Sequence, residues 1–479
     1  MFSCRPLCPD TPGMQKDRNR NMQIRIIGGS DAGISAALRA REVDPEADIR
    51  VYLADDFPNY SICGLPFFLS GETPDWHSLA HRTVFEGIEI RRSCPVRDID
   101  VRRKTITVRG TDGTTECVTY DRLVIGTGAV PVRPRIEGLD IPGAHELHSM
   151  EDSFRVKALL ERADAKSAVI VGSGFIGVEM ADALTHIGMK VTLVELEHVV
   201  FPSVDPEFGS LIQDKLRAHG VAVVNETEVT KIERGVSGLV VAARNGWRQN
   251  ADVVLVVVGV RPATDLAREA GIRLGERGAI QVNSRMETAV PGVYAAGDCA
   301  ETWHHLLQRY TYLPLGTTSH KQGRVAGENA AGGDREYAGS VGTQVVKIFD
   351  MVVARTGLRQ AETSDAGFPA AVTTPSIFND HKAYYPGATE MQFRITGDPI
   401  SGKLLGAQIV GHWKSEVAKR IDIFASALFH GMTVDGLNDL DLSYTPPLSS
   451  PWDPVQMSAQ AWLRENANID PIRDIAATR

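Results

Sequence analysis

Residues 60–68 read Tyr-Ser-Ile-Cys-Gly-Leu-Pro-Phe-Phe, and Cys63 is the side chain in this stretch best suited to covalent chemistry. We expect a helix to begin at this cysteine. The partial positive charge and free N–H groups of a helix N-terminus stabilise a thiolate. The position therefore predicts a lowered thiol pKa and a reactive sulfur.

The spacing within this stretch indicates how the sulfur would work. A dithiol site that closes an internal disulfide needs a second cysteine about one turn further on. That position is Phe68. A redox-active Cys63 would therefore act alone, cycling between a thiolate and a sulfenic acid or mixed disulfide. The alternative is a buried structural cysteine, so the flanking elements must decide.

The first element that could place a cofactor beside this sulfur is a small-residue turn. It follows a predicted strand at 23–27 and precedes a predicted helix at 34–43 and a strand at 49–53. Small residues there let the backbone approach a pyrophosphate at the helix N-terminus and let helix and strand pack closely. A serine stands where the second glycine is usual. The candidate residues are Gly28, Ser30, Ala32 and Gly33.

An acidic side chain at the end of the second strand normally holds a ribose hydroxyl of the dinucleotide. Strict spacing assigns this position to Leu53, which has no polar group. We take Asp55 as its substitute. One imperfect glycine turn indicates a dinucleotide site only weakly.

A second turn matches the dinucleotide fingerprint without departure. It lies between a predicted strand at 168–171 and a helix, and the next strand, Lys190–Val194, ends in Glu195. A carboxylate there binds both ribose hydroxyls of an adenosine and repels a 2′-phosphate. Because positions 196–198 contain no Arg or Lys, NADH is favoured over NADPH. The residues of this turn are Gly172, Gly174, Phe175, Ile176 and Gly177.

Length and composition exclude several classes of protein. The 479 residues carry a net charge of -9, which argues against binding to nucleic acid. No stretch approaches the roughly 18 apolar residues of a membrane-spanning helix, and the six cysteines are spaced too irregularly for a disulfide framework. We expect residues 1–21 to be a disordered extension and the protein to be cytoplasmic, with no membrane partner.

Further short signatures follow in a fixed order around the two turns. They lie at 126–131, 259–262, 297–298, 314–318, 321–327, 384–388 and 444–447. Together with 61–66, they resemble the FAD- and NAD(P)H-dependent disulfide-reductase superfamily over residues 22–458. Cys63 followed by Phe68 is similar to its single-cysteine branch, which contains coenzyme A-disulfide reductase, NADH oxidase, NADH peroxidase and NADH-dependent persulfide reductases.

The resemblance implies an α/β fold with two Rossmann-like dinucleotide-binding domains and a C-terminal α+β dimerisation domain. The FAD domain would be split into residues 22–140 and 272–335. The NADH domain would be 141–271, and residues 336–479 would form the interface of a homodimer.

The resemblance also implies roles for the cofactor sites. NADH would give hydride to the flavin, and the electrons would pass to the Cys63 sulfur, which reduces the outer substrate. Asp298 would bind the FAD ribitol, and a helix beginning near Ser319 would point at the flavin. Phe175 and Glu179 would lie beside the flavin ring. The other implied cofactor residues are Thr127, Gly128, Ala129, Gly259, Gly297, Gly316, Thr317 and Thr318.

Tyrosines of the last domain are implied to reach the active site of the partner subunit. They are Tyr444 and either Tyr385 or Tyr384. A hydroxyl there could protonate a leaving thiolate, and packing at the interface is the alternative role.

The chain departs from the relatives at informative positions. Peroxidase-like members carry a histidine where this chain has Asp31, so peroxidase activity is disfavoured. Coenzyme A-disulfide reductase-like members often have Asn before the cysteine and basic residues near the phosphates. Here Ile62 precedes the cysteine and Arg39 is the clearest basic candidate, which leaves coenzyme A itself open. His304 and His305 have no further ligands nearby in the sequence, so we expect surface histidines and no metal site.

We therefore expect an FAD enzyme that uses NADH to reduce a disulfide or persulfide of a low-molecular-weight thiol through Cys63. An NADH oxidase that reduces oxygen is one alternative. Another is an electron-transfer flavoprotein that serves a protein partner and does not need Cys63. A non-catalytic NADH sensor is disfavoured, because the acids expected at both dinucleotide sites are largely present.

Overall fold

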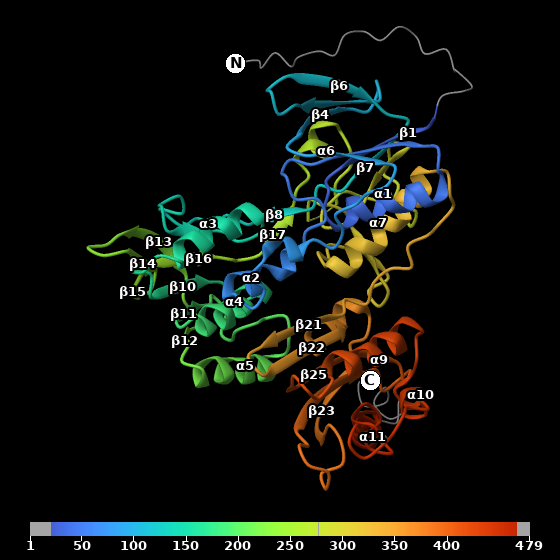
Figure 1. The fold of residues 1–479 in the computed structure, drawn as a ribbon. Helices are drawn as coiled ribbons and strands as arrows, with labels where there is room; N and C mark the ends of the chain where they lie inside the picture. Colours follow the sequence, from blue (N-terminus) through green and yellow to red (C-terminus); the bar gives the residue numbers. More distant parts are fainter. Residues whose placement is uncertain (1–20, 276, 467–479) are drawn as a thin grey trace, which may run out of the picture.

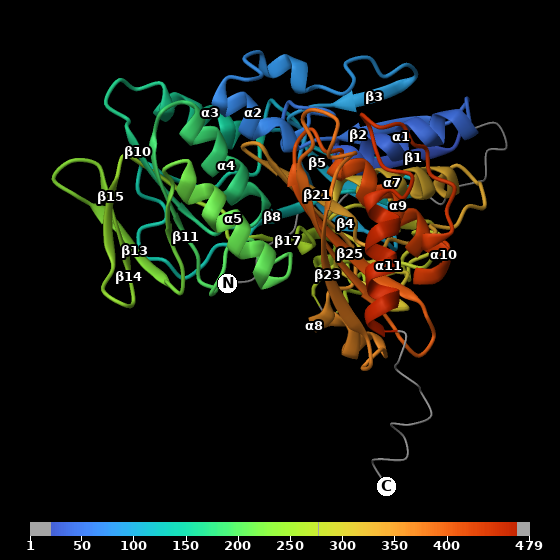
Figure 2. The ribbon, with the colours of Figure 1, turned by 90° about the horizontal axis from the view of Figure 1, so that it is seen from below.

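The computed structural model describes residues 21–275 and 277–466, so residues 1–20 of the expected disordered extension lie outside the described residues. Within the described part, three five-stranded sheets organise the chain (Figures 1 and 2). Two of these sheets are parallel and the third is antiparallel, with helices packed against each. The predicted α/β class, with an α+β C-terminal part, is confirmed.

The first sheet combines strands from both ends of a long sequence interval. Its elements are β1 (Gln23–Ile27), α1 (Asp31–Val43), β2 (Asp48–Tyr52), β3 (Ile88–Arg91), β7 (Arg122–Ile125) and β18 (Val293–Ala295). The strand order is β18-β7-β1-β2-β3, and all neighbours are parallel. α1 begins at Asp31, earlier than the predicted residue 34, because Ser30 ends the turn in extended backbone and an acid is favourable in the first turn.

The second sheet is inserted in the sequence between β7 and β18. Its elements are β9 (Ala144–His145), α3 (Met150–Leu160), β10 (Ser167–Val171), α4 (Phe175–His186), β11 (Lys190–Val194), α5 (Pro206–Ala218), β12 (Ala222–Val224) and β16 (Val253–Val256). The order is β12-β11-β10-β16-β9, again parallel. An antiparallel sheet of β13 (Val229–Arg234), β14 (Leu239–Ala243) and β15 (Arg248–Ala251) extends it.

Smaller elements complete the two parallel units. An antiparallel sheet of β4 (Val96–Asp100), β5 (Thr105–Arg109) and β6 (Thr115–Thr119) lies beside α6 (Asp265–Glu269). The two chain segments that connect the parallel sheets pair with each other as β8 (Ala129–Pro131) and β17 (Val260–Pro262). This pairing places residues 126–131 beside Gly259, whose carbonyl accepts a hydrogen bond of 2.9 Å from the Val132 N–H.

The C-terminal part is an antiparallel sheet covered by helices. Its elements are β21 (Gln344–Ile348), β22 (Met351–Gly357), β23 (Val372–Asn379), β24 (Glu390–Gly397), β25 (Leu404–His412), α9 (Val417–Phe429), α10 (Val434–Asn438) and α11 (Pro454–Asn466). A buried ion pair between Arg420 on α9 and Asp453, just before α11, fixes two of these helices together.

Two helices that are distant in the sequence lie side by side over the first sheet. They are α1 and α7 (Gly316–Ala330), which Figures 1 and 2 show next to each other. A Cβ atom at Gly323 of α7 would lie 2.3 Å from the Ala32 carbonyl oxygen, so only glycine allows this approach. The close packing brings the N-termini of α1 and α7 to one place.

Candidate active site

Cys63 lies in a 3₁₀ turn, Ile62–Gly64, directly before the short helix α2 (Leu65–Ser70). The cysteine is exposed, and so are its apolar neighbours Ile62 and Phe67. Phe68, at the position of a second redox cysteine, is buried with its ring 6.0 Å from that of Phe154. A single sulfur at this point of the chain agrees with the sequence analysis.

The predicted lowering of the Cys63 pKa is wrong for this chain. The protein packed behind the sulfur desolvates the thiol and raises its pKa, although part of the residue faces solvent. Negative charges on Asp31, Glu179 and Asp298 raise the pKa further. These acids come from three different elements, and the brief helix α2 does not outweigh them.

The two small-residue turns have the same backbone geometry. The Gly28 N–H donates to the Tyr52 carbonyl oxygen and the Gly172 N–H to that of Val194, both at 2.9 Å. Leu53 in the first unit therefore corresponds to Glu195 in the second, as strict spacing predicted. In both turns the last glycine is required by contact, because a Cβ there would lie 1.9 Å (Gly33) or 2.0 Å (Gly177) from a backbone oxygen.

Glu195 is buried and held in one orientation. One carboxylate oxygen accepts hydrogen bonds from the Ser173 N–H, at 2.9 Å, and from the Ser173 hydroxyl. The other oxygen accepts from the Glu197 N–H at 2.9 Å. A carboxylate positioned in this way beside the glycine turn fits the ribose of a dinucleotide.

Asp55 lies two residues beyond the position that corresponds to Glu195. Its carboxylate accepts a hydrogen bond of 3.0 Å from the Phe57 N–H, and burial raises its pKa. The side chain of Leu53 instead packs on Gly29, where a Cβ would lie 2.3 Å from Leu53 Cγ. Asp55 as a ribose ligand stays a prediction.

The N-terminal turns of α1 and α4 fit pyrophosphate groups. Ser30 and Gly174 precede these helices, and neither helix has a side-chain hydrogen bond that caps its first N–H groups. A Cβ at Gly174 would meet no atom within 4 Å, so packing does not explain the glycine, and the open space lies where a phosphate would approach. The two turns therefore fit FAD and a nicotinamide dinucleotide, the first through Gly28, Ser30, Ala32 and Gly33 and the second through Gly172, Gly174, Phe175, Ile176 and Gly177.

The end of β18 brings Asp298 to the junction of α1 and α7. Asp298 Oδ1 accepts a hydrogen bond of 2.9 Å from the Ser319 hydroxyl, and burial raises the pKa of this carboxyl. α7 begins at Gly316, so the predicted start near Ser319 is three residues late and Thr317 and Thr318 lie in its first turn. The buried hydroxyl of Tyr312 has no partner among the described residues. A polar group left open beside Asp298 fits the polar chain of a cofactor.

The residues expected between the two dinucleotide units lie together. Gly128 accepts a hydrogen bond of 2.9 Å from the Ala263 N–H, and the Thr127 hydroxyl donates to the Ala263 carbonyl at 2.6 Å. Ala129 pairs with Pro262 in the β8–β17 ribbon. The Thr127 hydroxyl thus has a structural partner, and its role in binding FAD stays a prediction.

Phe175 and Glu179 lie one turn apart on α4. The Phe175 ring packs edge-on against Phe201, with centroids 4.8 Å apart. Burial raises the pKa of Glu179 to about 7, with a further contribution from Asp182 and an opposing one from Lys347. Their expected places beside the flavin remain a prediction.

The tyrosines of the C-terminal part gather on an exposed surface. Tyr384, Tyr385 and Tyr444 are 73%, 44% and 45% exposed. A side-chain hydrogen bond with Tyr444 raises the pKa of Tyr384. Tyr385 instead packs near His381, with ring centroids 5.9 Å apart. Tyr444 therefore pairs with Tyr384, and not with Tyr385.

One expectation about a charged side chain is corrected, and a second side chain is found in ion pairs. His304 is buried in β19 (Thr302–His304), which pairs with β20 (Arg309–Thr311), and burial lowers its pKa to about 4. It is thus no surface residue, and no metal-binding group of three His, Cys, Asp or Glu occurs among the described residues. Arg39 forms ion pairs with Glu42 and Glu328, at 2.8 and 2.7 Å, so its charge is already neutralised.

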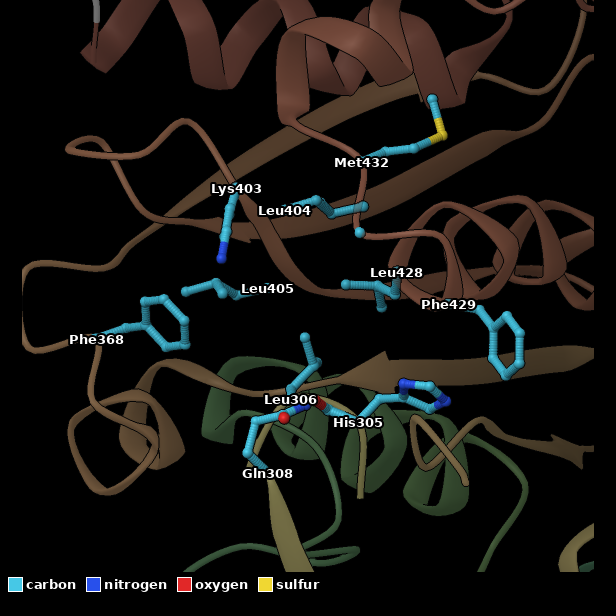
Figure 3. Close-up of a pocket in the computed structure, with 11 residues that line it drawn as sticks. His305, Leu306, Gln308, Phe368, Lys403, Leu404, Leu405, Leu428, Phe429 and Met432 are labelled. Atoms are coloured by element: carbon cyan, nitrogen blue, oxygen red, sulfur yellow. Dashed lines mark hydrogen bonds between the residues drawn. The ribbon is translucent and has the colours of Figure 1, made fainter. Parts of the chain in front are cut away.

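A cavity among the described residues lies away from Cys63. It measures about 490 Å³ and separates the β19–β20 hairpin from β25 and the end of α9 (Figure 3). Leucine, phenylalanine and methionine side chains form most of its wall, and Lys403 points into it. None of the predicted site residues lines this cavity.

No described helix is long and apolar enough to span a membrane.

Comparison with known proteins places this geometry in a family. Residues 22–323 match the family model described as pyridine nucleotide-disulphide oxidoreductase, and residues 343–454 match the dimerisation domain of the same family. The NAD(P)H coenzyme A polysulfide/persulfide reductase of Pyrococcus horikoshii is 34% identical over 448 residues, which cover 92% of this chain and 98% of that protein. An NADH oxidase of Methanocaldococcus jannaschii is 31% identical over 453 residues, or 93% of this chain and all of that protein (100%).

A solved structure agrees with these relatives. The NAD-dependent persulfide reductase of A. fulgidus superposes with a TM-score of 0.90 at 35% identity, covering 93% of this chain and 84% of that one. The chain belongs to the pyridine nucleotide-disulphide oxidoreductase family and is an FAD- and NAD(P)H-dependent oxidoreductase.

Proposed function

We propose that this enzyme uses NADH to reduce a disulfide or persulfide of a low-molecular-weight thiol through Cys63. The observation that carries the proposal is the exposed single cysteine with buried Phe68 in place of a second sulfur. A lone accessible sulfur can form a mixed disulfide with one outer molecule at a time. The names of the Pyrococcus and A. fulgidus relatives support the same substrate class.

We assign the domains as follows. Residues 22–140 and 272–335 bind FAD, and residues 141–271 bind NADH. Residues 336–479, of which 467–479 lie outside the described residues, form a dimer interface. The strand order of the first sheet, in which β18 joins β1 and β7, supports the split domain. The family match over 343–454 supports the interface.

The cofactor residues have defined tasks in this proposal. FAD, when bound, supplies two-electron transfer between NADH and a sulfur. The N–H groups that begin α1 and α4 hold the two pyrophosphates. Glu195 binds the ribose of NADH, Asp298 holds the ribitol of FAD, and Gly297, Gly316, Thr317 and Thr318 shape that site. Thr127, Gly128, Ala129 and Gly259 lie where the two dinucleotides approach each other.

The outer substrate meets Cys63 on an apolar and acidic surface. Ile62 and Phe67 are exposed beside the sulfur, and Arg39 is already paired with acids. These features favour a small thiol-derived substrate over one bound through several phosphates. Coenzyme A remains within the class, since residues of the partner subunit contribute to the site.

We further propose that the enzyme is a cytoplasmic homodimer. Tyr444 and Tyr385, with Tyr384, then lie over Cys63 of the partner subunit. Their exposure in the single chain supports this arrangement, because tyrosine combines an apolar ring with a polar hydroxyl at interfaces. The cytoplasm supplies NADH and keeps small thiols reduced.

The test separates the two halves of the reaction in the Cys63→Ser variant. Flavin reduction by NADH should continue, because this half does not need the sulfur. Turnover of disulfides and persulfides should fall by about 10⁴-fold or more, as expected for the loss of a covalent nucleophile. Cys94 and Cys299 are buried free thiols, so Cys94→Ser is a matched control that should keep turnover. Undiminished turnover in Cys63→Ser would contradict the proposal.

An NADH oxidase is the second candidate. The Methanocaldococcus relative, named an NADH oxidase, matches this chain along its whole length, which keeps this activity in contention. Oxygen consumption with NADH alone, compared with turnover of coenzyme A disulfide, coenzyme A persulfide and glutathione persulfide, distinguishes the two. Oxygen uptake that exceeds every thiol-linked rate would favour the oxidase.

A further inference from the structure

A histidine and an aspartate meet where α1 and α7 begin. His320 Nε2 lies 3.4 Å from Asp31 Oδ1, and His320 Nδ1 lies 3.0 Å from the Ser35 hydroxyl oxygen. The Ser35 hydrogen bond orients the imidazole through Nδ1, and the Asp31 carboxylate lies beside Nε2. Such an arrangement fixes which nitrogen can exchange a proton with a third group.

Asp31 occupies a position that suits an anion. It is the first residue of α1, and a Cβ on Gly316, the first residue of α7, would lie 3.4 Å from its second carboxylate oxygen. The positive ends of two helices therefore face this carboxylate. The Asp31–His320 pair lies where the close packing of α1 and α7 brings the N-termini of both helices together.

This place is also linked to the segment that carries the redox sulfur. The Asn59 N–H donates a hydrogen bond of 2.7 Å to the Gly29 carbonyl, which ties the segment leading to Cys63 to the turn before Asp31. In agreement, the Asp31 charge is the largest electrostatic contribution to the raised pKa of Cys63. Asp31 is thus near both the sulfur and the imidazole.

Accessibility leaves the imidazole free to act on a substrate. The side chain of His320 is 47% exposed, whereas that of Asp31 is 24% exposed. The Nε2–Oδ1 distance of 3.4 Å exceeds that of an ordinary hydrogen bond, so Nε2 can bond to another group.

We propose that His320, oriented by Asp31 and Ser35, is the acid–base residue for the substrate half-reaction at Cys63. The inference rests on the proposed function, in which Cys63 is the nucleophile. The imidazole comes from α7 and the carboxylate beside it from α1.

The step balances with the groups available. The Cys63 thiolate attacks one sulfur of a disulfide, a bond forms between these two sulfurs, and the original S–S bond breaks. The leaving thiolate takes the proton from Nε2 of the His320 imidazolium and departs as a thiol. Two electrons and one proton from NADH then cleave the mixed disulfide to the Cys63 thiolate and a second thiol, and His320 regains its proton from water.

Other charged groups around His320 define the controls. His81 lies on the same side, with its ring centroid 6.3 Å from that of His320. Asp298 is held by Ser319, the residue before His320, and Arg324, one turn further along α7, pairs with Glu42 at 3.7 Å. His430 follows α9 and is exposed outside this group, so His430→Gln serves as the matched control.

The test uses two disulfides whose leaving groups differ. Reduced holoenzyme is mixed with the disulfide of β-mercaptoethanol, whose alkyl thiolate needs a proton to leave, or with dithionitrobenzoate, whose aromatic thiolate leaves without one. The single-turnover rate of Cys63 is followed by mass shift or absorbance. His320→Gln should slow the alkyl reaction by about 100-fold, as expected for loss of a general acid. The aromatic reaction should change by less than about threefold, since its leaving group requires no acid.

A pH series completes the experiment. The parent enzyme should show a limb in the alkyl rate that His320→Gln lacks, while His430→Gln keeps it. Equal losses with both disulfides, no loss with either, or a selective loss in His81→Gln or Tyr444→Phe would overturn the assignment. Failure of the proposed function has a different signature, because Cys63→Ser would then retain steady-state turnover of disulfides with NADH.

Discussion

Replacement of Glu195 by Gln tests how the enzyme chooses its nicotinamide cofactor. The substitution keeps the shape of the side chain and removes its charge. The amide oxygen can still accept from the Ser173 N–H, the partner of one carboxylate oxygen at 2.9 Å. The amide nitrogen would face the Glu197 N–H, which loses its acceptor.

The magnitude follows from the bonds that a buried carboxylate makes. A hydrogen bond to a charged group contributes about 1.5–3 kcal/mol, and the amide retains only part of this. We expect kcat/KM for NADH to fall by roughly 10- to 150-fold. NADPH should lose nothing, because the charge that repels its 2′-phosphate is gone. The preference for NADH over NADPH should therefore fall by at least the same factor, mostly through KM.

Steady-state rates with both cofactors, measured in the same buffer, provide the assay. Glu197→Gln is the matched control, since it removes the same charge from an exposed side chain that lies two residues from Glu195. It should leave the cofactor ratio unchanged. A ratio in Glu195→Gln within about threefold of the parent value, or an equal change in Glu197→Gln, would refute the assignment of Glu195 as the ribose ligand.

Three further outcomes are expected. Asp31→Asn should lower the Cys63 pKa, because the Asp31 charge raises it. The rate at which iodoacetamide alkylates Cys63 in the holoenzyme should then rise at a lower pH than in the parent. An unchanged midpoint of this pH dependence would contradict the expectation. Arg420→Ala leaves Asp453 buried and unpaired, so urea unfolding should show a loss of about 3–5 kcal/mol, whereas Lys419→Ala, which breaks an exposed pair, should cost less than about 1 kcal/mol. Sedimentation at micromolar concentration should find a homodimer, and an active monomer would count against the shared active site.

Local patterns predicted much of the fold and of the dinucleotide sites. The alternation of strand and helix around residues 23–53 and 168–195 predicted units of parallel strands, because a glycine turn of this kind joins a strand to a helix in a defined backbone conformation. The correspondence of Leu53 with Glu195 could be counted along the sequence, since both follow strands in equal register. Helix starts were less accurate, as α1 and α7 each begin three residues before the predicted position.

Features that depend on tertiary contacts could not be predicted in this way. The raised pKa of Cys63 depends first on burial and then on the charges of Asp31, Glu179 and Asp298, which are separated by more than a hundred residues and meet only in the fold. The Asp31–His320 contact similarly joins two helices whose packing the sequence pattern does not specify. The burial of His304 could not be predicted, because two adjacent histidines show no hydrophobic periodicity that would distinguish a strand from a loop.

The difference between the two dinucleotide turns agrees with different uses of the two cofactors. In the proposed function NADH binds and leaves in every cycle and competes each time with NADPH, so a site at the second turn would gain from the buried, fixed charge of Glu195. A cofactor that stays bound is held by many contacts along its length and does not need selection at the ribose in each cycle. Leu53 lies at the position in the first unit that corresponds to Glu195 in the second. Its apolar side chain packs against Gly29 and so stabilises the first unit. We infer that the first turn serves FAD and the second NADH, and the apolar residue at position 53 agrees with this division.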